Sequence, residues 1–358
     1  MRNIMRKIIF LLKALSVYTI LHTVFTTVSI ANENNLKPSE MVAPTTAEQR
    51  KFQEDIQQGF SDVIKKIPPK YLYDEKGSEL FNKITKHPDY YLTNTEIGII
   101  NKYKKDLSAI LSTKRINIVE LGVGDGSKAS LLIDQFLLDS LDFIYSPVDI
   151  SATYLKDVVK NFKKKFKNTE INAINADYYL NALPLQGVDR TNVILFLGSS
   201  VGNFDPKETE QFLHNIRKSL KKGDYFLIGF DLEKRTDVLI KAYNDSGNIT
   251  KAFNLNLLER INRELGGNFN IKNFEHFETY NVYTKSMESY LISQINQKVH
   301  IKALGQDFYF KAFEPICTEH SYKYNLEMIE SFAKLSGFTI IKHYLDKNQY
   351  FAISLWQV

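Results

Sequence analysis

Polar side chains stand directly after short apolar runs of this chain, at positions where a ligand can meet them. Asp149 closes "SPVDIS", Asp177 and Tyr178 follow in "NADYY", and Asn203 lies beyond "LFLGSS". The next residues, "DPKE" (205–208), carry the N-cap, first-turn proline and capping-box glutamate of a helix start. Asn203 therefore belongs to a loop between a buried strand and a helix. The pattern predicts a small-molecule site along the carboxyl ends of strands.

The loop "VELGVGDGSKASLL" (119–132) has the residues of a cofactor-binding turn, because glycines let a backbone approach a ligand closely. A dinucleotide fingerprint beginning at Gly122 and Gly124 requires glycine at 127, where the chain has Ser127, and there is no Walker lysine motif. The pattern that remains, Glu120-x-Gly122-x-Gly124, is that of the loop that cradles S-adenosylmethionine.

Two further strand ends support this cofactor. Asp149 is placed to accept hydrogen bonds from the ribose hydroxyls, and Asp177 with Tyr178 is placed to meet the adenine. Each acid alone fits a helix cap or a loop equally well. Because three successive strand ends carry suitable residues in the right order, the set favours S-adenosylmethionine.

The order of elements predicts an α/β fold. Five β-rich runs, with helical stretches between most of them, indicate a parallel sheet covered on both faces: "INIVELG", "DFIYSPVDI", "EINAINAD", "NVILFLG" and "DYFLIGFDL". Residues 234–323 break this rhythm with a helix ending at Gly266 and with antiparallel strands "HFETYNVYT", "MESYLISQI" and "KVHIKAL". The closing helix (324–337) and two strands, "FTIIKHYLD" and "YFAISLW", are typical of class I methyltransferases, so 234–323 is an insertion.

The segment before the sheet also has a pattern. Residues 46–66 predict a helix with Phe52, Ile56, Phe60, Val63 and Ile64 on its apolar face. A turn-rich, tyrosine-rich stretch follows, and then a helix through "IGIINKYKKDLSAIL" (97–111).

Composition excludes several classes of protein. The chain has 358 residues, 44% of them hydrophobic, which is enough for a substantial core. A single cysteine, Cys317, excludes an internal disulfide and a cysteine-cluster metal site, and we expect no metal. Four basic residues and no acid lie in 1–31, so the rest of the chain is close to neutral and is not that of a general nucleic-acid binder. "NFKKKFK" (161–167) is interpreted as a solvated helix face.

Residues 1–31 form a hydrophobic leader, and 32–45 a polar linker. "MRNIMRK" is a basic start, and "SIA" before Asn32 has the small residues of a signal-peptidase site. Lys13 and His22 weaken the leader as a membrane span. A signal peptide, a membrane tether and a mis-assigned start all stay open. Because S-adenosylmethionine is made and held in the cytosol, a cytoplasmic protein is favoured over export, with membrane contact only through the leader if it is retained.

Five longer segments resemble one family, the histidine-specific Nα-methyltransferases that form hercynine in ergothioneine biosynthesis. They run in the same order from about residue 50 to the C-terminus: "PPKYLYDEKGSELFNKITKHPDYYLTNTE", "VELGVGDGSKASLL", "FLGSSVGNFDP", "AYNDSGNITKAFNLNLLERINRELGGNF" and "CTEHSYKY". The resemblance implies a Rossmann-like class I methyltransferase domain (98–233 and 324–358). It also implies an α+β domain that binds the amino acid (46–97 and 234–323).

The resemblance also implies site residues. Asn203 and Tyr243 would hold the α-carboxylate of L-histidine, because an amide and a phenol donate hydrogen bonds without adding positive charge beside a cationic cofactor. Glu319 and Ser321 would bind the ring nitrogens, with Tyr90 on the other side of the ring, and Tyr73 would lie near the amine. The cofactor contacts would be Gly122, Lys128, Asp149, Asp177 and Tyr178.

The chemistry implied is displacement of the sulfonium methyl by a neutral amine, three times, in a monomer. His320 would be a rim or strand residue. Ser289 departs from the family pattern, because a larger, methionine-like residue is expected on the pocket wall. Two alternatives therefore stay open: a methyltransferase for another amino acid or amine, and a catalytically silent protein that binds S-adenosylmethionine or an amino acid.

Overall fold

The structure is a computed structural model, and it describes residues 46–179, 183, 185 and 189–358. All of these belong to one unit of the chain, Pro44–Val358. The predicted leader and linker (1–31 and 32–45) lie outside the described residues. None of the described helices is long and apolar enough to cross a membrane.

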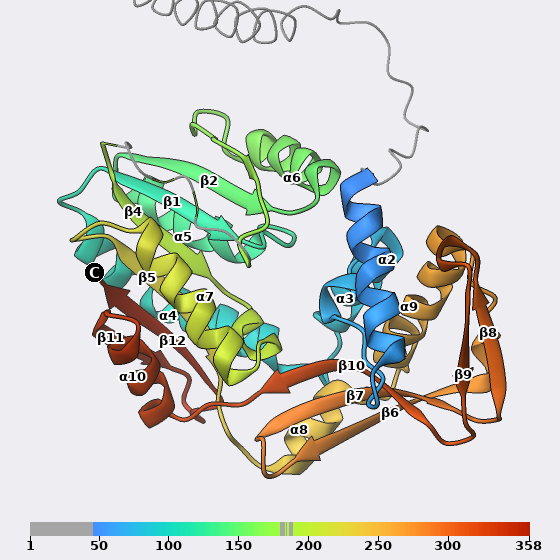
Figure 1. Ribbon diagram of the computed structural model, residues 1–358. Helices are drawn as coiled ribbons and strands as arrows, with labels where there is room; N and C mark the ends of the chain where they lie inside the picture. The colour runs from blue at the N-terminus through green and yellow to red at the C-terminus, as the bar shows by residue number, and fades with distance from the viewer. Residues whose placement is uncertain (1–45, 180–182, 184, 186–188) are drawn as a thin grey trace, which may run out of the picture. The chain divides into compact units, whose positions relative to one another are not determined.

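A seven-stranded sheet is formed by the strands between residues 116 and 231 together with the two C-terminal strands (Figure 1). The strand order is β11-β12-β5-β4-β1-β2-β3, in which the pairs β1–β2, β1–β4, β4–β5 and β2–β3 are parallel and β12 is antiparallel to both neighbours. The strands are β1 (Ile116–Leu121), β2 (Phe143–Asp149), β3 (Ile174–Asn175), β4 (Thr191–Phe196), β5 (Tyr225–Asp231), β11 (Thr339–Leu345) and β12 (Phe351–Gln357). The predicted parallel sheet and its closing hairpin are confirmed.

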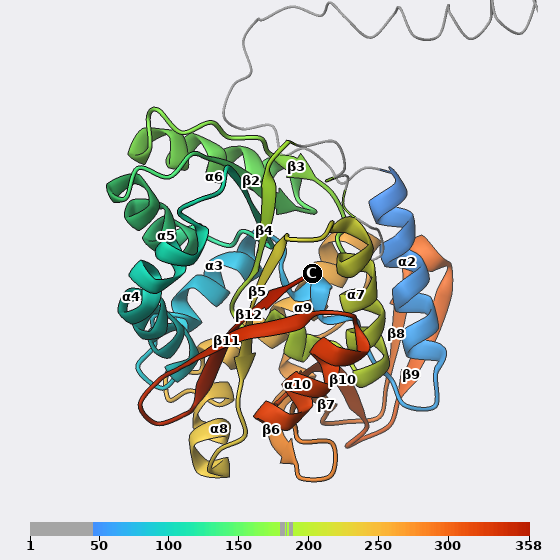
Figure 2. The same ribbon diagram turned by 90° about the vertical axis from the view of Figure 1, so that its left-hand side faces the viewer.

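Helices cover both faces of this sheet, because side chains alternate between the faces along each buried strand. Ile118 and Leu195 pack with one group of helices, whereas Val119 and Phe196 pack with the other. Figure 2 shows the groups on opposite sides of the strands. The first comprises α4 (Tyr91–Leu111), α5 (Ser127–Leu138) and α6 (Ala152–Lys165), and the second α7 (Pro206–Ser219) and α10 (Leu326–Leu335). We call the sheet with these helices the sheet lobe.

A second group of elements, the insert lobe, is formed by the insertion between β5 and α10 together with the N-terminal helices. Its three-stranded sheet has the order β10-β7-β6, and a separate hairpin pairs β8 with β9. Its helices are α2 (Thr46–Ser61), η1 (Pro69–Leu72), α3 (Glu75–Ile84), α8 (Thr236–Tyr243), α9 (Ile249–Leu265), η3 (Ile271–Asn273) and η4 (Lys302–Leu304). Its strands are β6 (Phe274–Asn281), β7 (Ser286–Ser293), β8 (Gln297–Ile301), β9 (Gln306–Phe310) and β10 (Pro315–Tyr322).

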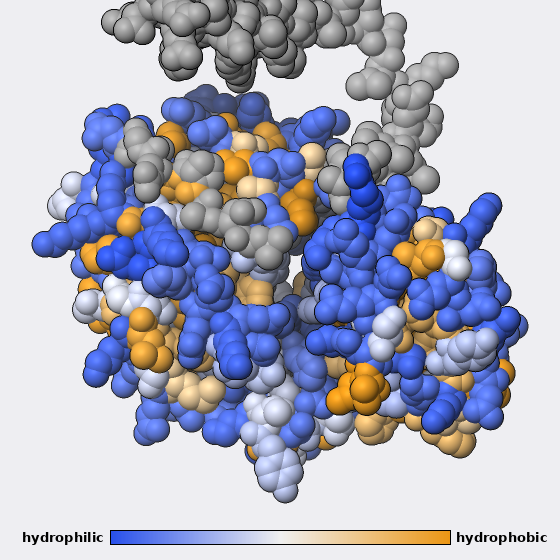
Figure 3. All heavy atoms as spheres, viewed as in Figure 1, coloured by the Kyte–Doolittle hydropathy of each residue, from blue (hydrophilic) through white to orange (hydrophobic). Residues whose placement is uncertain are grey.

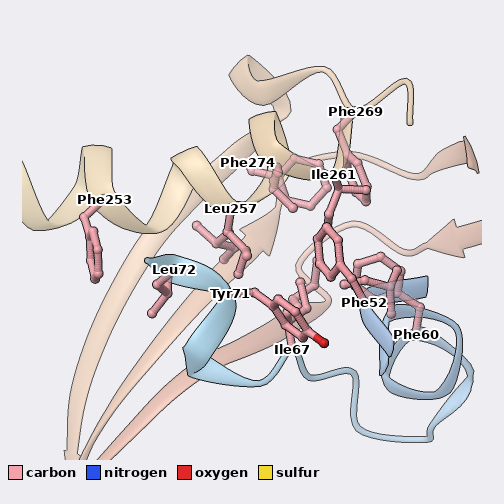
Figure 4. Packing of buried hydrophobic residues seen from close by; sticks show 14 of the residues in the cluster. Phe52, Phe60, Ile67, Tyr71, Leu72, Phe253, Leu257, Ile261, Phe269 and Phe274 are labelled. Atoms are coloured by element: carbon pink, nitrogen blue, oxygen red, sulfur yellow. The ribbon is translucent and has the colours of Figure 1, made fainter. Parts of the chain in front are cut away.

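The insert lobe has its own core, built where α9 faces the N-terminal segment (Figure 4). Phe253, Leu257 and Ile261 recur every four residues on α9 and are buried, which is the stripe of an amphipathic helix. They pack with side chains from residues 52–72, including Phe60 and Leu72. This packing attaches the segment that carries the site tyrosines to the insertion.

Two details differ from the predicted elements. The first helix ends at Ser61 and does not continue to 66, because Lys66 N donates to Gly59 O over 3.2 Å and the chain folds back there. Val63 and Ile64 are consequently exposed, so their predicted place on the apolar face was wrong. In addition, the segment predicted only as turns contains η1 and α3. The antiparallel strand predicted in "KVHIKAL" is present as β8, which pairs with β9.

Candidate active site

The glycine loop after β1 has the backbone conformation that its residues predict. Gly122 has φ of +65° and Gly124 of +51°, a left-handed region that L side chains rarely adopt. A Cβ at Gly122 would lie 2.6 Å from the Tyr178 hydroxyl, whereas no atom of the described residues lies within 4 Å of a Cβ at Gly124. The loop therefore packs tightly on Tyr178 at one end and leaves open backbone at the other.

The predicted acidic residues lie at the same edge of the sheet. Asp149 ends β2, where its carboxylate accepts a hydrogen bond from Ser151 N at 2.9 Å, and burial raises its pKa. Asp177 follows β3 and accepts from Tyr179 N at 3.0 Å. The rings of Tyr178 and Tyr179 stack with centroids 4.5 Å apart. The structure thus brings Gly122, Asp149, Asp177 and Tyr178 to one side of the sheet.

Lys128 has a partner that the sequence did not indicate. Its Nζ lies 2.9 Å from Oε2 of Glu96, a residue of α4 that is only 1% exposed. Glu96 also accepts from Gly198 N at 2.8 Å, at the end of β4. Glu120, whose carboxyl accepts from the Tyr145 hydroxyl, is buried, and burial raises its pKa to about 8. Lys128 is therefore oriented by Glu96 beside the end of β4.

Asn203 is the last residue of η2 (Ser200–Asn203), the short turn between β4 and α7. The capping box predicted after it is present, with reciprocal bonds between Asp205 and Glu208. The turn packs on β10: a Cβ at Gly202 would lie 3.0 Å from Tyr322 O and 3.5 Å from Ser321 Oγ. No side-chain hydrogen bond joins Asn203 to another described residue, so its amide is free for a ligand.

A buried lysine links the two lobes at this point. Lys323 has no exposed surface, and its Nζ lies 2.9 Å from Tyr243 Oη, 2.7 Å from Ser321 Oγ and 3.1 Å from Asp231 Oδ2. Tyr243, the last residue of α8, is 2.7 Å from Ser321 of β10. The predicted pair Tyr243 and Ser321 is thus held together by a residue that the sequence did not single out.

Asp231, at the end of β5, is the other centre of this network. The Tyr91 hydroxyl donates to both of its oxygens, at 2.8 and 2.7 Å, and Lys234 forms a second ion pair with it. Burial lowers the pKa of Lys234 to about 8. The backbone N–H of Asp231 donates to Ser199 Oγ at 2.8 Å, immediately before η2. The ends of β4 and β5 and the base of α8 are therefore fixed by one set of hydrogen bonds.

Glu319 lies on β10 opposite Ser289 of β7. Burial, reinforced by the negative charge of Glu278, raises the pKa of Glu319 to about 8. No hydrogen bond or ion pair joins its carboxyl group to any residue of the described chain. A carboxyl group without a protein partner at this depth is available to a ligand.

Tyr73 and Tyr90, the two tyrosines predicted in the N-terminal segment, lie near Tyr243 and Glu319. The rings of Tyr90 and Tyr243 have centroids 6.3 Å apart. Tyr73 is held edge-on by Phe253 at 5.4 Å, and 38% of its surface is exposed. Burial raises its pKa well above 10, as do Glu319 and Tyr90 beside it. Because deeply placed groups surround its hydroxyl, the exposed part of Tyr73 faces an internal space. Figure 3 shows a hollow between the two lobes.

Four charged residues of this region were not predicted from the sequence: Glu96, Asp231, Glu278 and Lys323. Two of them stand inside segments that were recognised as a whole, in "LTNTE" and "CTEHSYKY", but nothing in their spacing distinguished them from surface charges. Among the residues that the structure describes, no group of three or more His, Cys, Asp or Glu side chains is arranged to hold a metal ion.

The sequence profile of a family described as "Histidine-specific methyltransferase, SAM-dependent" matches residues 52–358. The chain belongs to this family. The methyltransferase is 32% identical over 303 residues to "Histidine N-alpha-methyltransferase" of Mycolicibacterium smegmatis, covering 84% of this chain and 93% of that one. "Ergothioneine biosynthesis protein 1" of Schizosaccharomyces pombe is 28% identical over 290 residues, covering 78% and 37%. The solved CcbJ methyltransferase from Streptomyces caelestis has a TM-score of 0.42 at 12% identity, covering 73% and 95%.

The residues of this methyltransferase fit its methyl donor, S-adenosylmethionine. The backbone at Gly124 is open on the ligand side, which is where a glycine loop admits a ligand. Asp149 uses backbone N–H groups to orient its carboxylate at the strand end, and it keeps acceptor capacity for hydroxyl donors. The predicted S-adenosylmethionine-dependent methyltransferase with a class I sheet is confirmed.

Proposed function

We propose that this methyltransferase transfers methyl groups to the α-amino nitrogen of L-histidine, up to three times, to give hercynine. The observation that carries the proposal is the group of Glu319, Tyr243 and Ser321 at the hollow between the lobes. It combines a partly buried carboxyl group that has no protein partner in the described chain with two hydroxyls that a buried ammonium orients. An imidazole with an N–H donor complements this group, whereas an alkyl or phenyl side chain leaves it unpaired.

The hydrogen bonds around Lys323 limit which of the two hydroxyls, Tyr243 or Ser321, can donate to the substrate. The ammonium has three N–H donors, which Tyr243, Ser321 and Asp231 accept. One hydroxyl hydrogen is shared between Tyr243 and Ser321, so a single one is left to point at the substrate. With Ser321 donating to Tyr243, Tyr243 donates to the α-carboxylate and Ser321 keeps a lone pair for a ring N–H. Asn203 donates to the carboxylate from the other side.

Tyr73 acts near the substrate amine. Because its pKa is raised well above 10, it stays a phenol at neutral pH and cannot serve as a base. Its oxygen instead accepts a hydrogen bond from the amine, which directs the nitrogen lone pair away from the ring. Tyr90 closes the side of the imidazole pocket next to Tyr243. Positioning and partial exclusion of water are then the main contributions of the protein.

S-adenosylmethionine supplies the electrophilic methyl group. Asp149 would bind its ribose, Asp177 and Tyr178 its adenine end, and Gly122 and Lys128 the part nearest the glycine loop. Each of the first two transfers leaves a proton to be lost before the nitrogen can react again. After the third transfer the nitrogen has no lone pair, so methylation stops.

The two ligands are assigned to different lobes. We assign residues 46–97 and 234–323 to amino-acid binding, and 98–233 and 324–358 to the methyl donor. We also propose that the protein is a monomer. A cytoplasmic location is supported by the cytosolic supply of S-adenosylmethionine. Light scattering and cell fractionation test these two statements, and mature protein beginning at Asn32 outside the cytosol would contradict the second.

Calorimetry tests the proposed substrate directly. The purified chain is titrated with L-histidine, L-phenylalanine and L-leucine in the presence of S-adenosylhomocysteine, and methyl transfer from S-adenosylmethionine is followed by mass spectrometry. We expect histidine alone to bind and to gain up to three methyl groups. Glu319→Ala should weaken histidine binding by about 2 kcal/mol, as expected for a lost hydrogen bond to a charged group. Equal turnover of phenylalanine would exclude the assignment.

A further inference from the structure

Glu278 lies in the same cross-strand row as Glu319. The register pairs Glu278 of β6 with Ser289 of β7, and Ser289 with Glu319 of β10. Residues that are directly opposite on neighbouring strands point to the same face of a sheet. The row therefore places two carboxyl groups on the face of the insert lobe that carries Ser321 and the core residue Met287.

The hydrogen-bond partners of Glu278 satisfy only one of its two carboxyl oxygens. Ser289 Oγ donates to its Oε1, and His276 Nε2 lies 3.1 Å from the same oxygen. The other oxygen, Oε2, is buried and has no hydrogen-bond partner in the described chain. The side chain of Glu278 has no exposed surface, so this oxygen is not satisfied by bulk water. A buried, unpaired carboxyl oxygen is costly unless a ligand completes it.

No described cation neutralises Glu278. Burial lowers the pKa of His276 to about 4, so this imidazole is neutral at physiological pH and contributes a hydrogen bond without charge. The positive charge of Lys323 acts against this rise of the Glu278 pKa, but Lys323 is already ion-paired with Asp231. Burial accordingly raises the pKa of Glu278 well above 4.5.

Glu278 is close enough to the proposed substrate pocket to act on its groups. Its charge is the largest electrostatic influence on Glu319, and it also acts on the Tyr243 hydroxyl. Ser289 stands between the two carboxyl groups in this row, and its hydroxyl donates to Glu278 Oε1. A methionine at this position would give Glu278 no hydrogen-bond donor. Ser289, the departure noted in the sequence, is thus explained by Glu278.

We propose that Glu278 is a second carboxylate of the amino-acid pocket and that it selects a cationic side chain, so that the pocket takes the guanidinium of L-arginine as well as the imidazolium of L-histidine. This deepens the proposed function and rests on its placement of the amino acid. A guanidinium carries enough N–H donors for Glu319, Glu278 and Ser321 together. A bound cation favours the charged form of the Glu278 carboxyl group, which burial disfavours.

The test compares two ligands of nearly equal shape, L-arginine and the uncharged L-citrulline, with L-histidine as the reference. Calorimetry is carried out on the full chain saturated with S-adenosylhomocysteine. We expect arginine to bind about tenfold or more tightly than citrulline, the effect of one charge-assisted hydrogen bond. In Glu278→Gln the preference should disappear, and histidine should bind about tenfold more weakly.

Glu275→Gln is the matched control, because Glu275 lies on the same strand, is exposed and points to the opposite face. It should leave the three affinities unchanged. Thermal unfolding and S-adenosylhomocysteine affinity check that each variant is folded. Ser289→Met provides a second variant, which should lose arginine binding more than histidine binding.

The outcomes separate this inference from the proposed function. If histidine binds and is methylated, while Glu278→Gln binds it like wild type and arginine is not preferred over citrulline, Glu278 has only a structural role and the inference is overturned. If histidine does not bind but arginine does, in a manner that depends on Glu278, the inference stands and the proposed substrate falls. If a folded protein that holds the cofactor product binds none of the three, both are overturned.

Discussion

Lys323 donates a hydrogen bond from Nζ to Tyr243 Oη over 2.9 Å, although no part of this lysine is exposed to solvent. Tyr243 belongs to α8, and Lys323 directly follows β10. Because the same ammonium is ion-paired with Asp231 at the end of β5, a single buried charge joins the sheet lobe to the insert lobe. Replacement of this lysine should therefore affect stability and substrate binding together.

We expect Lys323→Met to lower the free energy of unfolding by about 3 kcal/mol, because Asp231 loses one of its two buried ion pairs and Tyr243 and Ser321 lose a hydrogen-bond donor. Histidine binding should also weaken, since Lys323 positions Tyr243 and Ser321 without touching the substrate. Chemical unfolding and calorimetry measure the two effects. Lys285→Met is the control, because the Lys285–Glu233 ion pair (2.7 Å) is partly exposed and exposed pairs contribute about 0–1 kcal/mol. Wild-type values for Lys323→Met would contradict the positioning role.

Stability should fall as the pH rises from 6.5 to 8. Burial raises the pKa values of Glu120 and Glu319 from 4.5 to about 8, so the folded protein holds protons that the unfolded chain releases, and rising pH favours unfolding. His276 opposes this only between about pH 4 and 6.5, and Lys234 only above about pH 8. Melting temperatures at several pH values measure the effect. Glu319→Gln should reduce the slope, and an unchanged slope would show that Glu319 is ionised in the folded protein.

Asp149→Ala should weaken binding of S-adenosylhomocysteine while leaving the fold intact. The carboxylate makes local backbone hydrogen bonds at the end of β2 and is not part of the core, so its stability contribution is small. Titration calorimetry with the cofactor product, together with the melting temperature of the ligand-free protein, checks both statements. Asp157→Ala, an exposed position on α6, is the matched control. Equal cofactor affinity in the Asp149 variant would mean that the ribose partner has been misassigned.

Tyr73→Phe should lower kcat for methyl transfer while the dissociation constants of histidine and of S-adenosylhomocysteine stay near those of wild type. The ring keeps its edge-on contact with Phe253, and only the hydroxyl that orients the amine is lost. Single-turnover kinetics separates this step from binding. A selective rise in the histidine dissociation constant, with kcat unchanged, would show that the Tyr73 hydroxyl binds histidine and does not orient its amine.

Much of the sheet lobe follows from the sequence alone, because its determinants are local. Alternation of β-rich runs with helices identifies a parallel sheet, and glycine at positions 122 and 124 marks the turn that requires positive φ. Asp205 and Glu208 indicate the start of α7, because they form a capping box that spans four residues. In each case the physical cause lies within a few residues of the position it determines.

The charged residues of the site depend on contacts that no local pattern encodes. Glu96 and Lys128 are 32 positions apart in the sequence yet form an ion pair at 2.9 Å, and Lys323 meets Tyr243 across 80 positions. The role of Glu278 depends on the register of three strands, and a shift by one residue would turn it to the other face. Burial then changes the chemistry of the group, because it raises the pKa of the Glu278 carboxyl above the value that the group has in water. The residue types come from the sequence, but only the tertiary structure decides which charges are buried together and therefore which ligand they bind.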